Sequence, residues 1–394
     1  MTDDLRLLSA DDAEAAWALG SLTFGYHAQA MPEAPAEPPP GRRTWGVFGA
    51  DGRLLAKAVD LEQGHWFGGR SVPASGIAGV AVAADQRGRG LSRRLITRLL
   101  ADVRERGAVI STLFDTTPVP YRRLGWEEVG ARLTLAAPTL VLDAIRPLPH
   151  VTTRAAGPAD VAALGPLYDR VARDGTGMMD RNWPRFRQTP QEFLADWDGV
   201  TVAESAEGLI GYVTWDRGKG YEREAMFYIG ELYGLTADAT LALLGVVGGW
   251  ASVAPTFTIP FFASDPAFVL TSVLAHARID ARRPWCVRLV DAAGAIAARG
   301  WPPIAGVVDL DITDPECPWN AGRHRLVLDG GSARLEPGGA GTVRFTPRAL
   351  ASWYAGAATP GQLRRAGLLS GDTASDGLLT AATAGPPPTL LDYF

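Results

Sequence analysis

The sequence predicts two consecutive α/β domains followed by a third domain of the α+β class. Its 394 residues suit two or three domains of ordinary size. Helical and strand periodicities alternate up to about residue 284, and short strand-like runs interrupted by Gly and Pro follow. We therefore place the domains at residues 1–150, 151–284 and 285–394.

The first domain is predicted from apolar spacing and turn residues. The pattern predicts helices at 11–22 and 91–107 and strands at 44–48, 54–61, 75–83 and 111–114. The segment 31–41 is too rich in proline for a helix, so we expect an extended loop. That loop either covers a site or is simply flexible surface.

The second and third domains are predicted in the same way. For the second domain the pattern predicts helices at 160–173 and 239–253 and strands at 209–215, 225–232 and 256–262. Thr236 is the expected N-cap of the helix at 239–253. For the third domain it predicts strands at 286–290, 306–312, 324–328, 332–335 and 342–345 and helices at 347–354 and 360–366.

Composition excludes several classes of protein. The net charge of −5 argues against a nucleic-acid-binding protein, which needs a basic face. Two cysteines form no disulfide framework, and the five histidines never pair at ligand spacing, so we expect no metal site. The segment 239–264 has no charged residue, but Pro255 and Pro260 would break a spanning helix. The acidic first 20 residues do not resemble a secretion signal, so we expect a cytoplasmic protein without a membrane span.

The most informative segment, 79–92, runs from an alternating strand through a glycine-containing turn into an amphipathic helix. Gly88 and Gly90 allow a ligand close to the backbone, and the positive end of the helix dipole favours a pyrophosphate. As a dinucleotide fingerprint the turn fails, because Arg93 stands where the third glycine is needed. The other interpretation is an ordinary turn with solvated arginines.

Arg87-x-x-Gly90-x-Ser92, after Val80-Ala81-Val82, resembles the acetyl-CoA signature Q/R-x-x-G-x-G/A of the GCN5-related N-acetyltransferases (GNAT). Ser92 is a small departure from that pattern. The resemblance implies acetyl-CoA as co-substrate, with the backbone of Val80 to Val82 holding the pantetheine arm and the thioester carbonyl. The candidate residues for acetyl-CoA are Val80, Ala81, Val82, Arg87, Gly88, Arg89, Gly90, Leu91, Ser92, Arg93, Thr116 and Thr117.

Tyr121-x-x-x-Gly125-Trp126 resembles the same family's Y-x-x-x-G-F/W run. The resemblance implies that Tyr121 is the general acid that protonates the departing CoA thiolate. A positioned phenol of pKa about 10 can do this for a thiolate of pKa about 8.5. The alternative is a tyrosine that merely packs on the domain surface.

Over its whole length the chain is similar to the Eis (enhanced intracellular survival) acetyltransferases. The three domains, the glycine turn, the segments 169–183 and 309–326, and the terminal Phe394 carry this resemblance. It implies two tandem GNAT domains, of which only the first binds acetyl-CoA, then a domain like a sterol carrier protein, and a hexamer. It also implies that the α-carboxylate of Phe394 is the general base. Chain ends are often disordered, but the apolar end 390–394 favours burial.

The function that these observations predict is transfer of acetyl from acetyl-CoA to an amine by direct attack in a ternary complex. The resemblance implies polyamine-like acceptors such as aminoglycosides, or lysine side chains. Phe24, Tyr26 and Asp392 are candidate substrate-binding residues. Two alternatives stay open: a non-catalytic protein whose third domain binds an apolar ligand, and an acyltransferase for longer chains.

Overall fold

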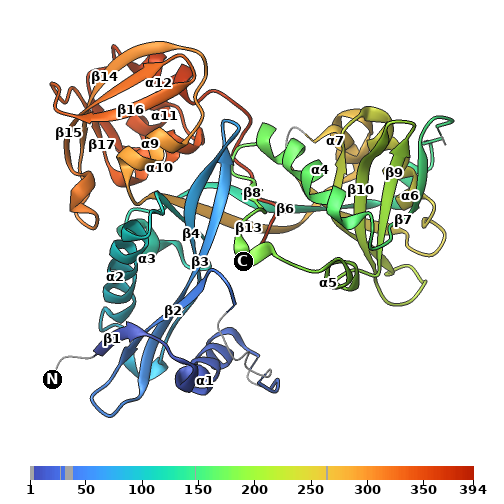
Figure 1. The fold of residues 1–394 in the computed structure, drawn as a ribbon, viewed down its shortest axis with the longest axis horizontal. Coiled ribbons are helices and arrows are strands. Elements are labelled where there is room, and N and C mark those ends of the chain that lie inside the picture. Colours follow the sequence, from blue (N-terminus) through green and yellow to red (C-terminus); the bar gives the residue numbers. More distant parts are fainter. Residues whose placement is uncertain (1–3, 27, 32–38, 147, 263–264) are drawn as a thin grey trace.

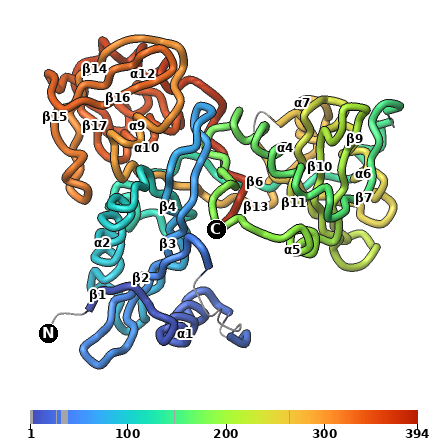
Figure 2. The backbone as a smooth tube through the Cα atoms, viewed as in Figure 1, coloured from blue at the N-terminus to red at the C-terminus, as the bar shows by residue number. Residues whose placement is uncertain are grey.

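The structure, a computed structural model, describes residues 4–26, 28–31, 39–146, 148–262 and 265–394. Figure 1 shows three bodies: the blue first part at the lower left, the green and yellow middle part at the right, and the orange and red last part at the upper left. The chain end returns to the centre of the molecule, between the first two bodies (Figure 2).

The first body combines a twisted sheet with three α-helices. Its strands are β1 (Asp4–Leu7), β2 (Arg42–Phe48), β3 (Leu54–Phe67), β4 (Arg70–Val82), β5 (Ile110–Phe114) and β6 (Glu127–Pro138). Its helices are α1 (Ala13–Phe24), α2 (Leu91–Glu105) and α3 (Pro118–Arg123), with short 3-10 turns at η1 (Ala10–Asp12), η2 (Ala84–Gln86) and η3 (Thr139–Leu142). The apolar stripe of α2 is buried as its spacing predicts: Leu91, Leu95, Ile96, Leu99, Leu100 and Val103.

The second body repeats this plan. Its strands are β7 (Thr152–Ala155), β8 (Met179–Asp180), β9 (Gly199–Ser205), β10 (Gly208–Arg217), β11 (Met226–Gly234) and β12 (Thr256–Phe261). Its helical segments are α4 (Val161–Asp174), η4 (Pro184–Phe186), α5 (Pro190–Ala195), α6 (Ala237–Gly248), α7 (Pro266–Leu270) and α8 (Val273–His276). Thr236 caps α6 as predicted, accepting a hydrogen bond of 3.1 Å from the Ala239 amide. The helix ends at Gly248 and not at residue 253, because consecutive glycines disfavour its continuation. No helix in the described ranges is long and apolar enough to cross a bilayer.

The third body has its own sheet, ordered β16-β15-β14-β17-β18. The last part of the chain contains β13 (Arg278–Leu289), β14 (Ala305–Ile312), β15 (Gly322–Asp329), β16 (Ser332–Pro337), β17 (Val343–Phe345) and β18 (Leu369–Gly371). Its helical segments are α9 (Ala292–Ala298), η5 (Pro318–Asn320), α10 (Pro347–Ala355), α11 (Pro360–Arg365) and α12 (Asp376–Ala382). Large side chains fill its interior, among them Phe345, Trp353 and Tyr354.

One continuous sheet joins the first two bodies, in the order β1-β2-β3-β4-β5-β13-β6-β12-β11-β10-β9-β7. Strand β13, late in the chain, inserts between β5 and β6, and β6 pairs on its other side with β12 of the second body. The proposed limit at 284/285 therefore falls inside β13, and the domain limits stay predictions. Strand β6 and the first half of β13 were not predicted from the sequence, because the short alternation of Ile279 and Ala281 among charged residues is a weak signal and residues 278–283 are largely exposed.

Candidate active site

The parallel strands β4 and β5 separate at one end. Their pairing runs as far as Ile77 and Leu113. Beyond this point β4 continues to Val82, whereas β5 ends at Phe114. The backbone of residues 78–82 therefore lies unpaired on the side of β5. This is where the sequence predicts that the pantetheine arm and the thioester bind.

A bulge in β4 accentuates this separation. Val59 of β3 pairs with Ala78, and Lys57 pairs with Ala81, so β4 holds one residue more than β3 between these pairs. Gly79 lies in the bulge with φ +55°, a conformation that favours glycine. The sequence reasoning missed the bulge, and the glycine inside a strand pattern was the signal for it.

The turn after β4 presents backbone amides to solvent. Gly88 and Gly90 have φ of +79° and +76°, and Gly90 is the N-cap of α2. Because the N-cap is a glycine, it offers the first amides of α2 no side-chain acceptor. Arg87 and Arg89 are exposed beside the turn. The geometry is that of an anion site whose donors belong to the backbone.

Two residues that the sequence predicts to bind acetyl-CoA, Leu91 and Arg93, have side chains that contact other parts of the protein. Leu91 points its side chain into the core, being 5% exposed, so only its backbone can face a ligand. Arg93 forms an ion pair with Glu316 of the third body, with 2.5 Å between Nη2 and Oε1. Thr116 and Thr117 lie exposed just beyond the end of β5.

Tyr121 lies on α3, directly beyond the opening between the strands. Its ring meets Trp126 edge-on, with 6.3 Å between centroids. No hydrogen bond to its hydroxyl is formed by any residue in the described part of the chain. Burial, reinforced by the charge of Asp115, raises the pKa of Tyr121 to about 12. The phenol is therefore protonated at neutral pH and able to donate.

Asp115 is a site residue that the sequence reasoning missed. It follows β5 directly, is 9% exposed, and accepts a hydrogen bond from the thiol of Cys286. Burial raises the pKa of Asp115 and, more strongly, that of Cys286. A carboxylate at the end of a buried strand was the available signal.

The glycine of the Tyr-x-x-x-Gly-Trp run has a structural reason. Gly125 has φ +94°, and a side chain there would collide with the guanidinium of Arg288 from β13. Arg288 donates hydrogen bonds to the Leu124 carbonyl and to Asp314, the latter at 2.7 Å. The turn that follows Tyr121 is thus held by the inserted strand and by the third body.

The carboxyl-terminal tail follows a defined path into the centre of the molecule. The Thr389 amide donates to the Thr176 carbonyl at 2.8 Å, and Leu390 is fully buried. Arg132 of β6 donates from Nε to the Leu391 carbonyl at 2.6 Å. The Phe394 ring packs against hydrophobic side chains of the core, close to the end of β5.

The three predicted substrate-binding residues are divided between the two bodies. Phe24 and Tyr26 lie at the end of α1 with parallel rings 6.4 Å apart, and Phe24 is 49% exposed. Asp392 instead faces the second body and pairs with Arg181 at 2.7 Å. The segment 32–38, within the predicted loop 31–41, lies outside the described residues.

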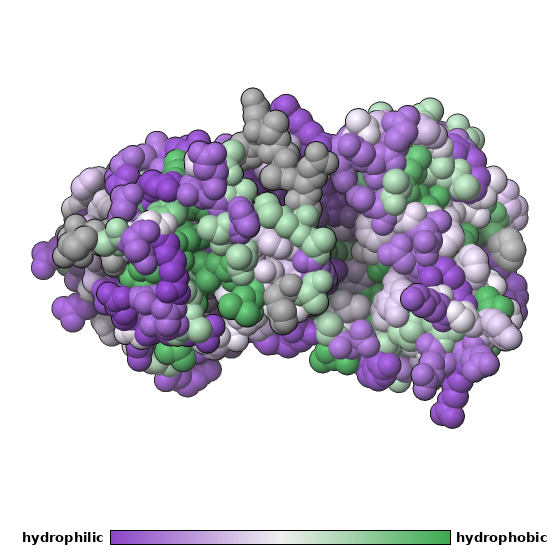
Figure 3. Space-filling view, turned by 90° about the horizontal axis from the view of Figure 1, so that it is seen from below, coloured by the Kyte–Doolittle hydropathy of each residue, from purple (hydrophilic) through white to green (hydrophobic). Residues whose placement is uncertain are grey.

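Two cationic side chains, the buried Lys57 on β3 and the half-buried Arg185 beside the tail, were not anticipated from the sequence. Lys57 is 8% exposed, and burial together with nearby Arg42 lowers its pKa to about 8. Arg185 lies over the Phe394 ring, with 5.6 Å from Cζ to the centroid. Burial lowers the pKa of Arg185 as well. Figure 3 shows the face seen from below, where the surface is hollowed between the two halves of the molecule.

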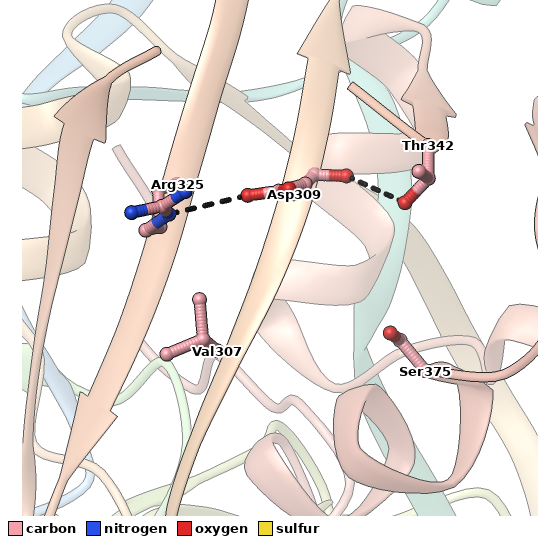
Figure 4. Close-up of a pocket in the computed structure, with 5 residues that line it drawn as sticks. All are labelled: Val307, Asp309, Arg325, Thr342 and Ser375. Atoms are coloured by element: carbon pink, nitrogen blue, oxygen red, sulfur yellow. Dashed lines mark hydrogen bonds and ion pairs between the residues drawn. The ribbon is translucent and has the colours of Figure 1, made fainter. Parts of the chain in front are cut away.

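The third body has a hollow of about 470 Å³ of a different character. Four of its five lining residues are polar, and Figure 4 shows Arg325 and Asp309 joined across neighbouring strands, with 3.3 Å between Nε and Oδ1. Such a lining does not suit an apolar ligand. Among the residues in the described ranges, no group of three or more His, Cys, Asp or Glu side chains gathers for a metal ion.

Comparison with known proteins decides the family. The family model for the acetyltransferase (GNAT) domain matches residues 4–129, and that for the sterol carrier protein domain matches residues 292–391. A GCN5-related N-acetyltransferase from Kribbella flavida is 30% identical, with 100% of this chain and 99% of that chain covered and a TM-score of 0.84. The chain belongs to the GCN5-related N-acetyltransferase family. The predicted enzyme class and combination of folds are thereby confirmed.

Other relatives of this acetyltransferase agree. A protein of Streptomyces avermitilis, described as an uncharacterized N-acetyltransferase, is 28% identical over 363 residues, which is 84% of each chain. Eis1 from Mycobacterium abscessus is 23% identical, with a TM-score of 0.78 over 99% of this acetyltransferase and 100% of Eis1. The likeness to Eis1 shows a shared fold over the whole length, as the resemblance to the Eis proteins implies.

Proposed function

We propose that this acetyltransferase moves the acetyl group of acetyl-CoA to a primary amine in a single direct displacement. The observation that carries this proposal is the opening between β4 and β5. It lies between an uncapped helix start, suited to a pyrophosphate, and Tyr121, suited to a leaving thiolate. The unpaired backbone of residues 78–82 lies where an extended pantetheine arm would join the two.

The chemistry then divides between the two ends of the site. The carboxylate of Phe394 takes a proton from the ammonium of the acceptor, directly or through one water. The freed amine attacks the thioester carbonyl, forming the C–N bond, and the C–S bond breaks as the tetrahedral intermediate collapses. Tyr121 donates its proton to the departing sulfur, so that CoA leaves as a thiol. The nitrogen, which carries an extra proton after attack, releases it through water to the tyrosinate, and this leaves a neutral amide and restores the phenol.

The acceptor class follows from the resemblance and from the charges at the site. Polyamine-like molecules, aminoglycosides among them, and lysine side chains are the acceptors we propose. Arg185 adds positive charge beside Phe394, and Lys57 and Arg42 add it on β3 and β2, so like charges oppose a highly cationic acceptor. Within this class we therefore expect acceptors with few ammonium groups, or with a neighbouring anionic group, to be favoured over those with the highest positive charge.

The experiment that tests the function is release of CoA thiol with a panel of amines. The panel consists of spermidine, kanamycin, a peptide with an unmodified lysine, and a monoamine. Each amine is assayed with acetyl-CoA and with a longer acyl-CoA. Thiol release that depends on the amine supports the proposed transferase activity. The rates with the two acyl-CoA substrates show whether the acyl pocket accepts a chain longer than acetyl. If the protein binds acetyl-CoA tightly but releases no CoA thiol with any amine, the proposed transferase activity is contradicted.

Three further statements rest on the sequence and stay proposals. They are the domain limits at 150/151 and 284/285, assembly into a hexamer, and a place in the cytoplasm. Light scattering of the purified protein tests the hexamer, which a monomeric mass would contradict.

A further inference from the structure

The second body holds a pocket of its own, and every lining residue except Asp392 lies on an element that takes no part in the proposed acetyl transfer. It has a volume of about 290 Å³ and is formed by α4, η4, α5, β10, β11, the loops beside η4 and α5, and one residue of the tail. Apolar and aromatic side chains make up much of its wall, including Phe186, Phe193 and Trp197. Gly165 of α4 also lines it, and a Cβ atom at this position would meet no atom within 4 Å.

Charged side chains form another part of the lining. Arg181 pairs with Asp392, at 2.7 Å from Nη2 to Oδ1, and with Glu231. The Tyr212 hydroxyl donates to Glu231 at 2.7 Å. These three charged side chains are only 12–21% exposed, so their interactions are weakly screened by solvent. Arg181, Glu231 and Asp392 therefore form one network in which each side chain helps to fix the positions of the others.

The charges of this network do not balance. Among the lining residues, Glu231 and Asp392 share the guanidinium of Arg181. Arg132 and Arg185, which do not line the pocket, also attract the charge of Asp392. Asp196, an exposed residue, lines the same pocket and accepts a hydrogen bond of 2.8 Å from the neutral side-chain amide of Gln188. The lining thus carries a surplus of negative charge, and an ionised carboxylate has room for several hydrogen-bond donors. A negative lining within aromatic walls suits a cation attached to an apolar body.

We propose that this pocket binds an organic cation, a primary ammonium on an apolar or aromatic body, at a site separate from that of acetyl transfer. The ammonium lies against Glu231 and Asp392, and the carbon body lies between α4 and α5. The ligand is either a second molecule of an acceptor amine or an amine that is not acetylated.

The pocket is connected to the transfer site through the tail. Asp392 is two residues before Phe394, and its carboxylate is held by Arg181 and contacts the Tyr168 hydroxyl at 3.2 Å. A cation bound at Asp392 therefore acts on the segment that carries the proposed base. This connection rests on the proposed function, whereas binding itself does not.

The test is calorimetric titration of the full chain with 2-phenylethylamine in the absence of acetyl-CoA. Val161→Trp places a bulky side chain at the pocket wall, and Val269→Trp is the matched control, because Val269 is 77% exposed on α7 and does not line the pocket. We expect Val161→Trp to weaken binding about ten-fold or more and the control to bind as the native protein does. Equal affinity of all three proteins, or no binding at millimolar amine, would overturn the proposal.

A second comparison tests the role of charge. 2-Phenylethanol has the same body without the ammonium, and Glu231→Gln removes one carboxylate while leaving a hydrogen-bond acceptor. We expect the alcohol to bind about ten-fold more weakly than the amine, and Glu231→Gln to reduce that preference. Equal binding of amine and alcohol to the native protein would refute the inference of a cation site. Since these measurements involve no turnover, their failure is distinguishable from failure of the proposed transferase.

The two possible sources of the ligand are separated by an acetylation assay of the same amine. Product formation by the native protein identifies an acceptor. Binding that Val161→Trp weakens, without product at any concentration, identifies an amine that acts only at the pocket.

Discussion

The ring centroids of Phe394 and Phe114 lie 5.3 Å apart, at an interplanar angle of 55°. Tyr393 meets the same Phe114 ring at 4.9 Å. Because Phe114 is the last residue of β5, these contacts bring the end of the chain to the opening between β4 and β5. The aromatic end of the chain thus packs on the body that carries the acetyl-CoA signature.

The first expectation concerns the terminal carboxylate. Adding two glycines after Phe394 converts this carboxylate into an amide, and we expect kcat to fall about 10²-fold or more with little change in the Kd for acetyl-CoA. Phe394→Leu is the matched control, since it removes the ring but keeps the carboxylate, and should retain more activity than the extended chain. Full activity in the extended protein would show that another group is the base.

The second expectation concerns Tyr121. Tyr121→Phe removes the proton donor but keeps the ring against Trp126, so kcat should fall about 10²-fold while the melting temperature stays close to native. Because the pKa of Tyr121 is raised to about 12, its protonation should impose no fall in rate between pH 6 and 10. Tyr221→Phe, at a position 75% exposed, serves as control. An unchanged kcat in Tyr121→Phe would remove this residue from the mechanism.

The third expectation concerns Lys57 and pH. With its pKa lowered to about 8, Lys57 is largely charged at pH 7 and loses that charge as the pH rises through 8. Its repulsion of a cationic acceptor should fade over the same interval. Lys57→Met should therefore lower KM for spermidine at pH 7, and the ratio of native to variant KM should approach one by about pH 9.5. A ratio that does not change with pH would mean that Lys57 does not face the acceptor.

The fourth expectation concerns the buried ion pair between Arg288 and Asp314, whose side chains are 1% and 3% exposed. Asp314→Ala leaves a buried guanidinium unpaired, and we expect the free energy of unfolding to fall by about 3–5 kcal/mol in urea denaturation. Asp311→Ala is the control, because Asp311 lies 3.9 Å from the exposed Arg344 and should contribute under about 1 kcal/mol. Equal losses in the two variants would show that Arg288 is stabilised by other contacts.

What the sequence could predict was local. The stripe of α2, the Thr236 cap and the glycines of the turn each depend on neighbours a few residues away, and the structure has them as expected. Motifs of a few residues likewise predict a role for Tyr121, which stays a prediction. Lys57 and Asp115 went unnoticed because a single polar residue in a strand gains meaning only from distant neighbours. The insertion of β13 between β5 and β6 was not predicted for the same reason. Tertiary contacts decide which strands pair, and local periodicity does not record those contacts.

The insertion of β13 also bears on the order in which the molecule assembles. During synthesis, β5 is completed at Phe114, but the strand that pairs beside it ends at Leu289. The ribosome adds about 5–20 residues per second, so the edge of β5 waits roughly ten seconds or longer for its partner. Over that interval a nascent chain exposes an open strand edge, the kind of surface that invites wrong pairing. A gene shortened at residue 150 would make this exposure permanent, so the second half must be retained for folding even if it performs no chemistry.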